Sequence, residues 1–342
     1  MAGQLNMTVS GSSDRETRLS FVLPVATQGT GRDHCDLARA RRLCVSLERF
    51  FDLDCLETVV VVTPLRDLAA THSALAPFNN SLRMQIVSET DFCPILASNP
   101  QTLNIWPRPN LGWFRQQLIK LAAHTFVTTP FYMTLDADVI FVRPFSASTL
   151  IRDGRALLAT LTAEDLKGLF RQDVASHEIV VRNHRVAQAE ATLQLMRPEG
   201  LSEFWYGETP AILARNIVAE MASHLENIWG GDWQEVLLSR IPWTEYALYG
   251  LFAEVTGQLE TYHRRGGMNA VLRLSHSLWR PSADYLIPRD LENWDVERVF
   301  ESDADGVAVV VQSYLGYELE VEDARIGARL FGGMPCRSPE KR

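Results

Sequence analysis

The sequence predicts an α/β protein whose mixed, mostly parallel sheet is flanked by helices. Strand-like apolar runs alternate with helix-like segments at the spacing of strand-helix-strand units. The β-branched run at residues 57–62 has no polar alternation, which is typical of a parallel strand buried on both faces. The chain has 342 residues, of which 46% are hydrophobic and 22% charged, enough for one large domain or two smaller ones.

The first half of the chain supplies the expected core of this sheet. Residues 19–25 form the first strand, a turn follows at residues 28–31, and a helix begins with Asp33 as its N-cap. Apolar positions after Asp33 fall on one helical stripe that includes Leu37, Ala40, Leu43 and Leu47. Residues 57–62 and 83–88 are then the second and third strands.

A proline-rich segment leads from the third strand to a helix. We expect residues 89–112 to be irregular and residues 113–126 to be helical, with Phe114, Leu118, Leu121, Ala122 and Thr125 as the buried stripe. Gln117, Lys120 and His124 lie on a different stripe with Trp113. In a right-handed crossover this polar stripe can approach the ends of the strands, where Gln117 and Lys120 are candidates to contact a donor phosphate or Asp136. The alternative for Lys120 is a solvated charge on the helix surface.

The strand pattern that begins at Phe131 runs directly into two carboxylates, Asp136 and Asp138, before a further apolar run. Ionised carboxylates at the end of a buried strand are costly to desolvate unless a cation meets them. At a strand end the chain turns, so both side chains can converge on one hard cation such as Mg²⁺ or Mn²⁺. Two other Asp-x-Asp pairs, at residues 52–54 and 303–305, lie in polar surroundings, where a solvated surface is expected.

Charge and cysteine content exclude several classes of protein. A formal net charge of −9 argues against a nucleic-acid binder. The five cysteines include no Cys-x-x-Cys pair, so we expect reduced structural thiols. The N-terminus carries no signal-like segment, and no window of about 18 apolar residues appears. These features predict a cytoplasmic protein without a transmembrane segment.

Several blocks together resemble one enzyme class. They are Gly-Trp at residues 112–113, Gln-Gln-Leu-Ile-Lys at 116–120, the Asp-x-Asp block at 131–138, Tyr-Gly-Glu-Thr-Pro at 206–210 and Trp-Thr-Glu-Tyr at 243–246. Over roughly residues 19–290 the chain resembles nucleotide-diphospho-sugar transferases of the Rossmann-like glycosyltransferase-A fold, and more narrowly a sparsely characterised group of bacterial and algal sequences.

The resemblance implies a metal-dependent transfer of a sugar to a hydroxyl acceptor, such as a glycan or glycoconjugate. UDP-sugars are the commonest donors in the resembling families, so we expect a UDP-sugar together with Mn²⁺ or Mg²⁺. Motif matching makes Asp138 a metal ligand and lets Asp136 contact the ribose, the metal or both. The nucleoside would be bordered by residues near the end of the first strand, namely Pro24, Val25, Thr27 and Asp33.

A further metal or diphosphate ligand is expected late in the chain, with His276 as the first choice and His263 as the second. An inverting transferase also needs a general base, usually a carboxylate, to remove the proton of the acceptor hydroxyl. Glu245 and Asp232 are the candidates. Both also have a structural explanation, because Glu245 opens a predicted helix and Asp232 is placed to cap another. A retaining mechanism is left open.

The second half of the chain is expected to bind the acceptor. It is rich in aromatic residues, of which Trp205, Tyr206 and Trp243 are the candidates to contact a sugar, and residues 264–267 can form a lid or a solvated turn. We expect a polar N-terminal tail (1–18), a catalytic domain (19–290) divided into a nucleotide-sugar half (19–145) and an acceptor half (146–290), and a C-terminal extension (291–342) packed on it, loosely structured from residue 327.

Two alternatives remain at this level. The glycines at residues 29–31 faintly resemble the loop of a sugar-nucleotide pyrophosphorylase, although the spacing is poor and no lysine signature follows. A non-catalytic carbohydrate-binding protein with the same fold is the other alternative, because a fold does not guarantee an activity.

Overall fold

The computed structural model describes residues 17–27, 36–97, 111–198, 204–240, 242–301 and 305–330. Several sequence-based expectations therefore lie outside the described residues. These are the turn at residues 28–31, the N-cap and nucleoside contact assigned to Asp33, and the part of the irregular segment at residues 98–110.

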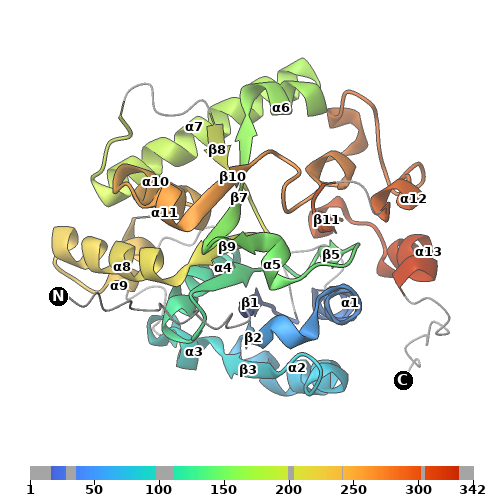
Figure 1. Ribbon diagram of the computed structural model, residues 1–342, viewed down its shortest axis with the longest axis horizontal. Coiled ribbons are helices and arrows are strands. Elements are labelled where there is room, and N and C mark those ends of the chain that lie inside the picture. Colours follow the sequence, from blue (N-terminus) through green and yellow to red (C-terminus); the bar gives the residue numbers. More distant parts are fainter. Residues whose placement is uncertain are drawn as a thin grey trace, which may run out of the picture.

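The centre of the fold is a five-stranded sheet in the order β3-β2-β1-β4-β9 (Figure 1). Its strands β1, β2, β3 and β4 are mutually parallel, and β9 runs antiparallel to β4. Their bounds are Leu19–Pro24, Leu56–Thr63, Met84–Ser88, Phe131–Thr134 and Ala211–Ala214 for β9. The expected α/β class, with a mostly parallel sheet flanked by helices, is confirmed.

The strands and their connecting helices follow the predicted pattern closely. Every residue of β1 and β4 is buried, and β2 has a single partly exposed position, so the β-branched run fills the interior as expected. The connections contain α1 (Asp36–Phe50), α2 (Leu68–Leu75), α3 (Glu89–Phe92) and α4 (Leu111–Ala122). The segment expected to be irregular after residue 88 thus begins with α3 and the 3₁₀ helix η4 (Pro94–Ala97).

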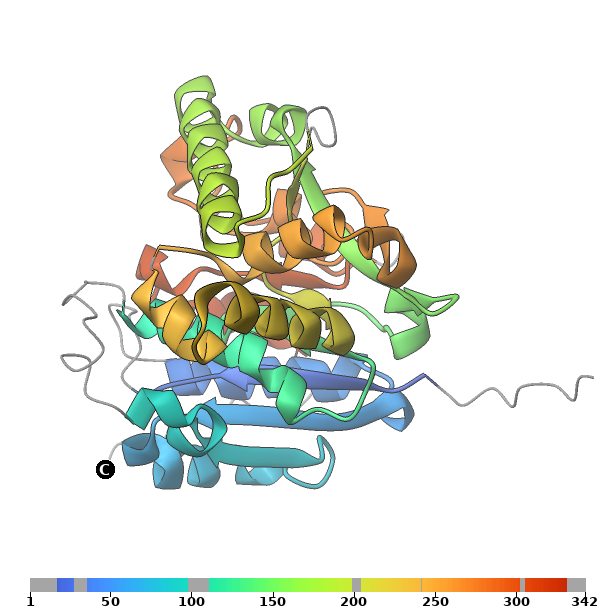
Figure 2. The same ribbon diagram turned by 90° about the vertical axis from the view of Figure 1, so that its left-hand side faces the viewer.

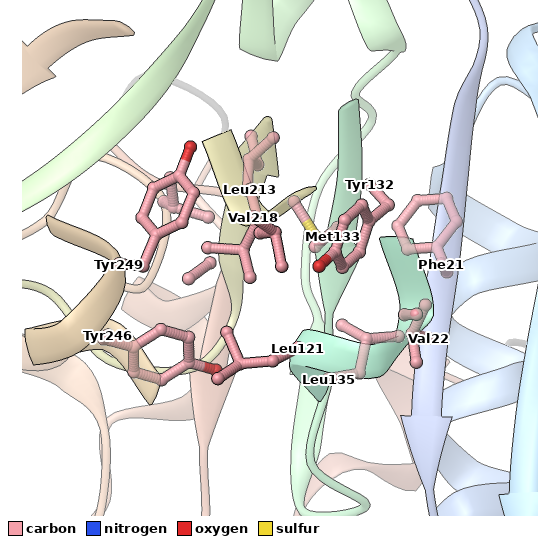
Figure 3. Packing of buried hydrophobic residues seen from close by; sticks show 14 of the residues in the cluster. Phe21, Val22, Leu121, Tyr132, Met133, Leu135, Leu213, Val218, Tyr246 and Tyr249 are labelled. Atoms are coloured by element: carbon pink, nitrogen blue, oxygen red, sulfur yellow. The ribbon is translucent and has the colours of Figure 1, made fainter. Parts of the chain in front are cut away.

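Figure 3 shows how this interior is packed, with Phe21 of β1, Tyr132 and Met133 of β4 and Leu213 of β9 meeting in one cluster. On α4, Leu118, Leu121 and Ala122 are buried as predicted, whereas Thr125 is exposed. The stripe expected to be polar is also buried, because Gln117, Lys120 and His124 are less than one-tenth exposed. No solvated face is therefore left for Lys120, and the surface alternative for this residue is wrong.

A second set of strands stands over the parallel sheet, on the side where α7 rises in Figure 2. Strand β7 (Arg155–Thr162) pairs with β10 (His263–Gly266), β6 (Ile151–Arg152) and β8 (Phe204–Tyr206). Residues 264–266 are thus part of a paired strand, and the lid or turn expected there is wrong. The surrounding helices are α5 (Ala147–Leu150), α6 (Ala163–Leu169), α7 (Gln172–Leu193), α8 (Arg215–Trp229), α9 (Trp233–Ser239), α10 (Glu245–Val255) and α11 (Leu259–Tyr262).

The C-terminal segment lies against the first half of the chain, with α13 beside α1 (Figure 1). Strand β11 (Ala308–Val310) pairs antiparallel with β5 (Val139–Phe141), which directly follows the Asp-x-Asp turn. Buried ion pairs join Arg39 and Arg42 of α1 to Glu322 of α13 (Leu319–Leu330) at 3.0 and 2.6 Å. The extension also contains the short helix α12 (Val296–Val299), and α13 continues past residue 327, from which a loose structure was expected.

Short 3₁₀ turns complete the described chain: η1 (Leu53–Cys55), η2 (Leu65–Asp67), η3 (Ala76–Phe78), η5 (Ala123–Thr125), η6 (Leu274–His276), η7 (Ser282–Asp284) and η8 (Ser313–Leu315). Among the residues that the structure describes, no helix has both the length and the apolar character needed to cross a bilayer.

Candidate functional site

A cavity of about 440 Å³ opens at the carboxyl ends of β1 and β4. Pro24 and Val25 at the end of β1, and Asp136 and Asp138 after β4, line the side that faces the parallel sheet. Open α/β sheets bind ligands at this edge, because the loops that follow parallel strands meet there. Of the nucleoside-site candidates, Thr27 is not among the lining residues and binds Asp67 through both its amide nitrogen, at 3.0 Å, and its hydroxyl, at 2.6 Å.

Asp138 is the least satisfied carboxylate of the site. It is 7% exposed, its Oδ2 accepts a bond from the Ser313 amide at 3.2 Å, and its Oδ1 is buried without a hydrogen-bond partner among the described residues. Burial and the nearby charge of Asp136 raise the pKa of Asp138 to about 7. A buried carboxylate oxygen without a donor is unusual in a folded protein, which makes Asp138 a candidate to contact a ligand.

Asp136 has a cationic partner inside the protein. The Lys120 ammonium lies 2.7 Å from Asp136 Oδ1 and 3.0 Å from Glu245 Oε1, so one lysine on α4 joins the Asp-x-Asp turn to the start of α10. Lys120 also donates to the Tyr246 hydroxyl at 3.3 Å. Burial lowers the pKa of Lys120, but the nearby Asp136, Tyr246 and Glu245 raise it by more. The pKa of Lys120 therefore lies well above the usual value. The predicted contact between Lys120 and Asp136 is confirmed.

Glu245 lies in this cluster and lines the cavity. Its side chain is buried, and desolvation raises its pKa against the opposing effect of Lys120. The helix that it begins is capped by Thr244, whose hydroxyl accepts from the Ala247 amide at 3.3 Å. Gln117 Oε1 accepts from the Glu245 backbone amide at 3.1 Å, and Gln117 does not line the cavity. Gln117 therefore positions Glu245, instead of contacting a donor as the sequence analysis expected.

Three other candidates lie away from the cavity walls. Asp232 is exposed and caps α9 by accepting from the Gln234 and Glu235 amides, which agrees with its structural explanation and not with a role as base. His276 bonds to Ser275 at 2.9 Å, and burial together with Arg273, Arg298 and Arg289 lowers its pKa to about 4. These arginines disfavour a cation, so His276 is not positioned as a metal ligand.

His263, the second choice, is also a structural residue. It is fully buried and lies 2.5 Å from the Tyr249 hydroxyl, with its other ring nitrogen 3.3 Å from the Ala156 carbonyl. Burial lowers its pKa to about 4. Among the described residues, no three histidine, cysteine, aspartate or glutamate side chains are grouped as a ligand set. The expected third protein ligand is therefore not found there.

The wall opposite the Asp-x-Asp turn is built largely by α7, which the sequence analysis did not single out. Arg182 and Arg185 lie 3.0 and 2.8 Å from Glu208, and Glu178 binds Arg280 at 2.6 Å. All five line the cavity. Glu178 and Arg182 are four residues apart, which in a sequence is the ordinary pattern of a solvated helix pair, so no signal marked them as site residues.

Aromatic side chains cover the same wall. Trp205, Tyr206, Trp279 and Tyr314 line the cavity, so two of the three predicted aromatic candidates reach it. Tyr206 is bonded to Glu254, and Trp205 donates to Asn183 at 3.0 Å. These bonds fix the rings beside the charged groups of α7.

The C-terminal segment also contributes to the site. Gln312, Ser313 and Tyr314 line the cavity, and Ser313 supplies the described hydrogen bond to the Asp138 side chain. Asp36, the first residue of α1, faces the same space. Neither feature was predicted from the sequence. Asp33 was the acidic residue expected to border the nucleoside here, and residues beyond 291 were expected to form an extension.

A second cavity of about 210 Å³ adjoins the first and shares three of its lining residues, Trp113, Arg185 and Thr244. Its other walls are formed by Val181, His184, Gln188, Pro242 and Trp243. Trp243, the third aromatic candidate, thus lines this smaller space although its own exposure is nil.

Comparison with known proteins assigns the chain to a family but not to a reaction. Residues 16–328 match the family of unknown function DUF6492, and the chain belongs to that family. No curated protein matches it in sequence. Among solved structures, the apo form of mouse xyloside xylosyltransferase 1 aligns with a TM-score of 0.46 and 12% identity, over 86% of this chain and 97% of that one. The function must therefore be argued from the site itself.

Proposed function

We propose that this member of the DUF6492 family is a metal-dependent glycosyltransferase. It would move a sugar from a nucleotide-diphospho-sugar, with a UDP-sugar as the expected donor, to a hydroxyl of a carbohydrate acceptor. The observation that carries the proposal is the buried Oδ1 of Asp138, which has no hydrogen-bond partner in the described part of the chain and lies at the edge of the sheet where such a fold binds its ligands. The blocks that resemble nucleotide-diphospho-sugar transferases surround this same turn.

The two aspartates fit a hard divalent cation. Carboxylate oxygens are preferred ligands of Mg²⁺ and are equally suited to Mn²⁺, and a cation would satisfy the Asp138 oxygen that the described residues leave unbonded. Asp136 already binds Lys120, so Asp138 is the more direct ligand. When bound, the metal supplies charge neutralisation for the departing nucleoside diphosphate.

The donor would lie between the ends of β1 and β4. Pro24 and Val25 offer apolar surface to a nucleoside, and Asp36 and Asp136 offer carboxylates to ribose hydroxyls. Lys120 is held at the base of this space by two carboxylates and is therefore a fixed positive charge, not a mobile one. Its role would be to hold Asp136 and Glu245 in place while the cation and diphosphate bind.

Glu245 is the proposed general base. It lines the cavity on the acceptor side of Lys120, and burial makes its carboxylate more basic than a solvated one. Gln117 holds its backbone and Lys120 holds its side chain. It would accept the proton of the acceptor hydroxyl as that oxygen attacks the anomeric carbon. Asp232 caps a helix outside the cavity and has no catalytic role in the proposed mechanism.

The first test is thermal unfolding with a panel of nucleotide sugars and nucleoside diphosphates, with and without Mn²⁺, for the wild type and Asp138→Ala. A ligand that binds only the folded state raises the unfolding midpoint. We expect a metal-dependent shift with one nucleotide, and its loss in the variant. A shift with no nucleotide at all would refute a donor site and favour a non-catalytic role.

The second test addresses the base. Glu245→Gln keeps the size of the side chain but removes the proton acceptor, so transfer should fall about 10²–10⁴-fold while nucleotide binding persists. Asp232→Asn is the matched control, because an asparagine still caps α9 and the residue lies outside the cavity. Equal losses in both variants would contradict the assignment. Release of nucleoside diphosphate from a nucleotide sugar distinguishes transfer from the pyrophosphate release of a pyrophosphorylase.

A further inference from the structure

The two cavities are neighbours along α7. They share Trp113, Arg185 and Thr244 as lining residues, so each of these side chains borders both spaces. On α7, Val181, His184, Arg185 and Gln188 occupy positions i, i+3, i+4 and i+7, which places them on one helix face. Glu178 and Arg182 continue that face into the larger cavity.

The proposed base stands where the two spaces meet. Thr244 lines both cavities and directly precedes Glu245, which lines the larger one. An acceptor whose reacting hydroxyl lies at Glu245 would reach the smaller cavity by extending past Thr244. Because it depends on Glu245 as the base, this step rests on the proposed function.

The chemistry of the smaller cavity suits a sugar ring. Trp113 is 39% exposed and offers an aromatic plane, while His184, Gln188 and Thr244 offer hydrogen-bonding groups. Sugar rings pack their C–H faces on aromatic planes and direct hydroxyls to planar polar side chains. Among the described residues, the cavity walls contain no carboxylate that would favour a cation, and Arg185 shares the carboxylate of Glu208 with Arg182.

We infer that the acceptor is a saccharide of at least two units, and that the smaller cavity holds the unit next to the one that reacts. The nucleotide is not its natural occupant, because Pro24, Val25 and Asp138 all line only the larger cavity. The smaller space is about half the volume of the larger one, in keeping with a single added ring and not a second nucleotide sugar.

The test uses an array of immobilised neutral and acidic mono-, di- and trisaccharides, probed with labelled protein in Mn²⁺ and UDP. We expect a glycan of two or three units to bind at least about tenfold better than its component monosaccharide. The double variant His184→Ala/Gln188→Ala should lose at least about fivefold of that binding. His177→Ala is the matched control, because His177 is an exposed histidine of the same helix that lines neither cavity.

Each outcome decides a different point. Equal binding of monosaccharides, or full binding by the double variant once its folding has been verified by circular dichroism, would overturn the inference. So would the absence of any bound glycan while UDP and Mn²⁺ still stabilise the wild type, and in that case the donor part of the proposed function would stand. Loss of the nucleotide shift in the wild type would instead remove the proposed function itself.

Discussion

Replacing Asp138 with asparagine should stabilise the metal-free protein at neutral and alkaline pH, although it removes the proposed metal ligand. The carboxyl group is 7% exposed, and one of its oxygens has no hydrogen-bond partner within the described ranges. An asparagine of nearly the same shape carries no charge, and its carbonyl oxygen can keep the bond from the Ser313 amide. A residue retained at a cost in stability is expected at a functional site.

The magnitude follows from the raised pKa of Asp138. Below the ordinary value of 3.8 the carboxyl is protonated in both the folded and the unfolded chain, so its ionisation costs folding nothing. As the pH rises through 3.8 the unfolded chain releases its proton first, and stability falls until the folded carboxyl ionises near pH 7. At about 1.4 kcal/mol for each pKa unit, the full cost is about 4 kcal/mol at pH 8 and roughly 2 kcal/mol at pH 5.

Urea unfolding in EDTA at pH 5 and pH 8 measures this effect. The stability advantage of Asp138→Asn over the wild type should grow between the two pH values, and Mn²⁺ should stabilise the wild type but not the variant. Asp136→Asn is the control, because it weakens the pairing with Lys120 and should not stabilise the protein at pH 8. A variant less stable than the wild type at pH 8, or an advantage independent of pH, would refute the reasoning.

Three further outcomes are expected. Lys120→Met leaves two carboxylates without their buried cation and should lower the free energy of unfolding by about 3 kcal/mol in urea titrations; a change near zero would contradict the pairing. Gly250→Ala places a methyl group against the Tyr206 ring and should destabilise by about 1–3 kcal/mol, whereas Gly168→Ala, in an open helical position, should stabilise by about 0.5–1 kcal/mol. Burial raises the pKa of Cys93 to about 12, so iodoacetamide at pH 8 should alkylate it only after unfolding, as mapped by mass spectrometry.

The sheet could be predicted because its signals are local. Strands β1 and β2 lie within a residue or two of the apolar runs, since a strand buried on both faces must be apolar throughout. The partly exposed β3 also begins within one residue of its predicted start. The helix α10 could also be predicted from a local signal, and it begins at Glu245 directly after its N-cap, Thr244. The error at residues 264–266 has a physical cause as well. Arginines and glycines are typical of a turn, and only pairing with β7 makes this segment a strand.

The site residues that could be predicted are charged residues whose burial costs free energy. Asp136 and Asp138 could be singled out because they interrupt an apolar pattern at a strand end, and Lys120 because it lies on a polar stripe of the preceding helix. Arg182 could not, because a basic residue four positions after a glutamate is also what a solvated helix shows. The bond from Ser313 to Asp138 joins positions 175 residues apart, and only the tertiary structure brings them together.

The distribution of charge across the cavity has a consequence for the order of binding. On the side of the parallel sheet, the described lining includes the carboxylates of Asp136, Asp138 and Glu245 and one ammonium group, that of Lys120. On the α7 side, Arg182 and Arg185 share the carboxylate of Glu208, and Arg280 is bonded to Glu178 and Asp284. A nucleoside diphosphate approaching the strand ends would therefore meet net negative charge, which repels it. A divalent cation reverses this, so nucleotide without metal should leave the unfolding temperature unchanged. Cation and nucleotide together should raise it by more than the sum of their separate effects.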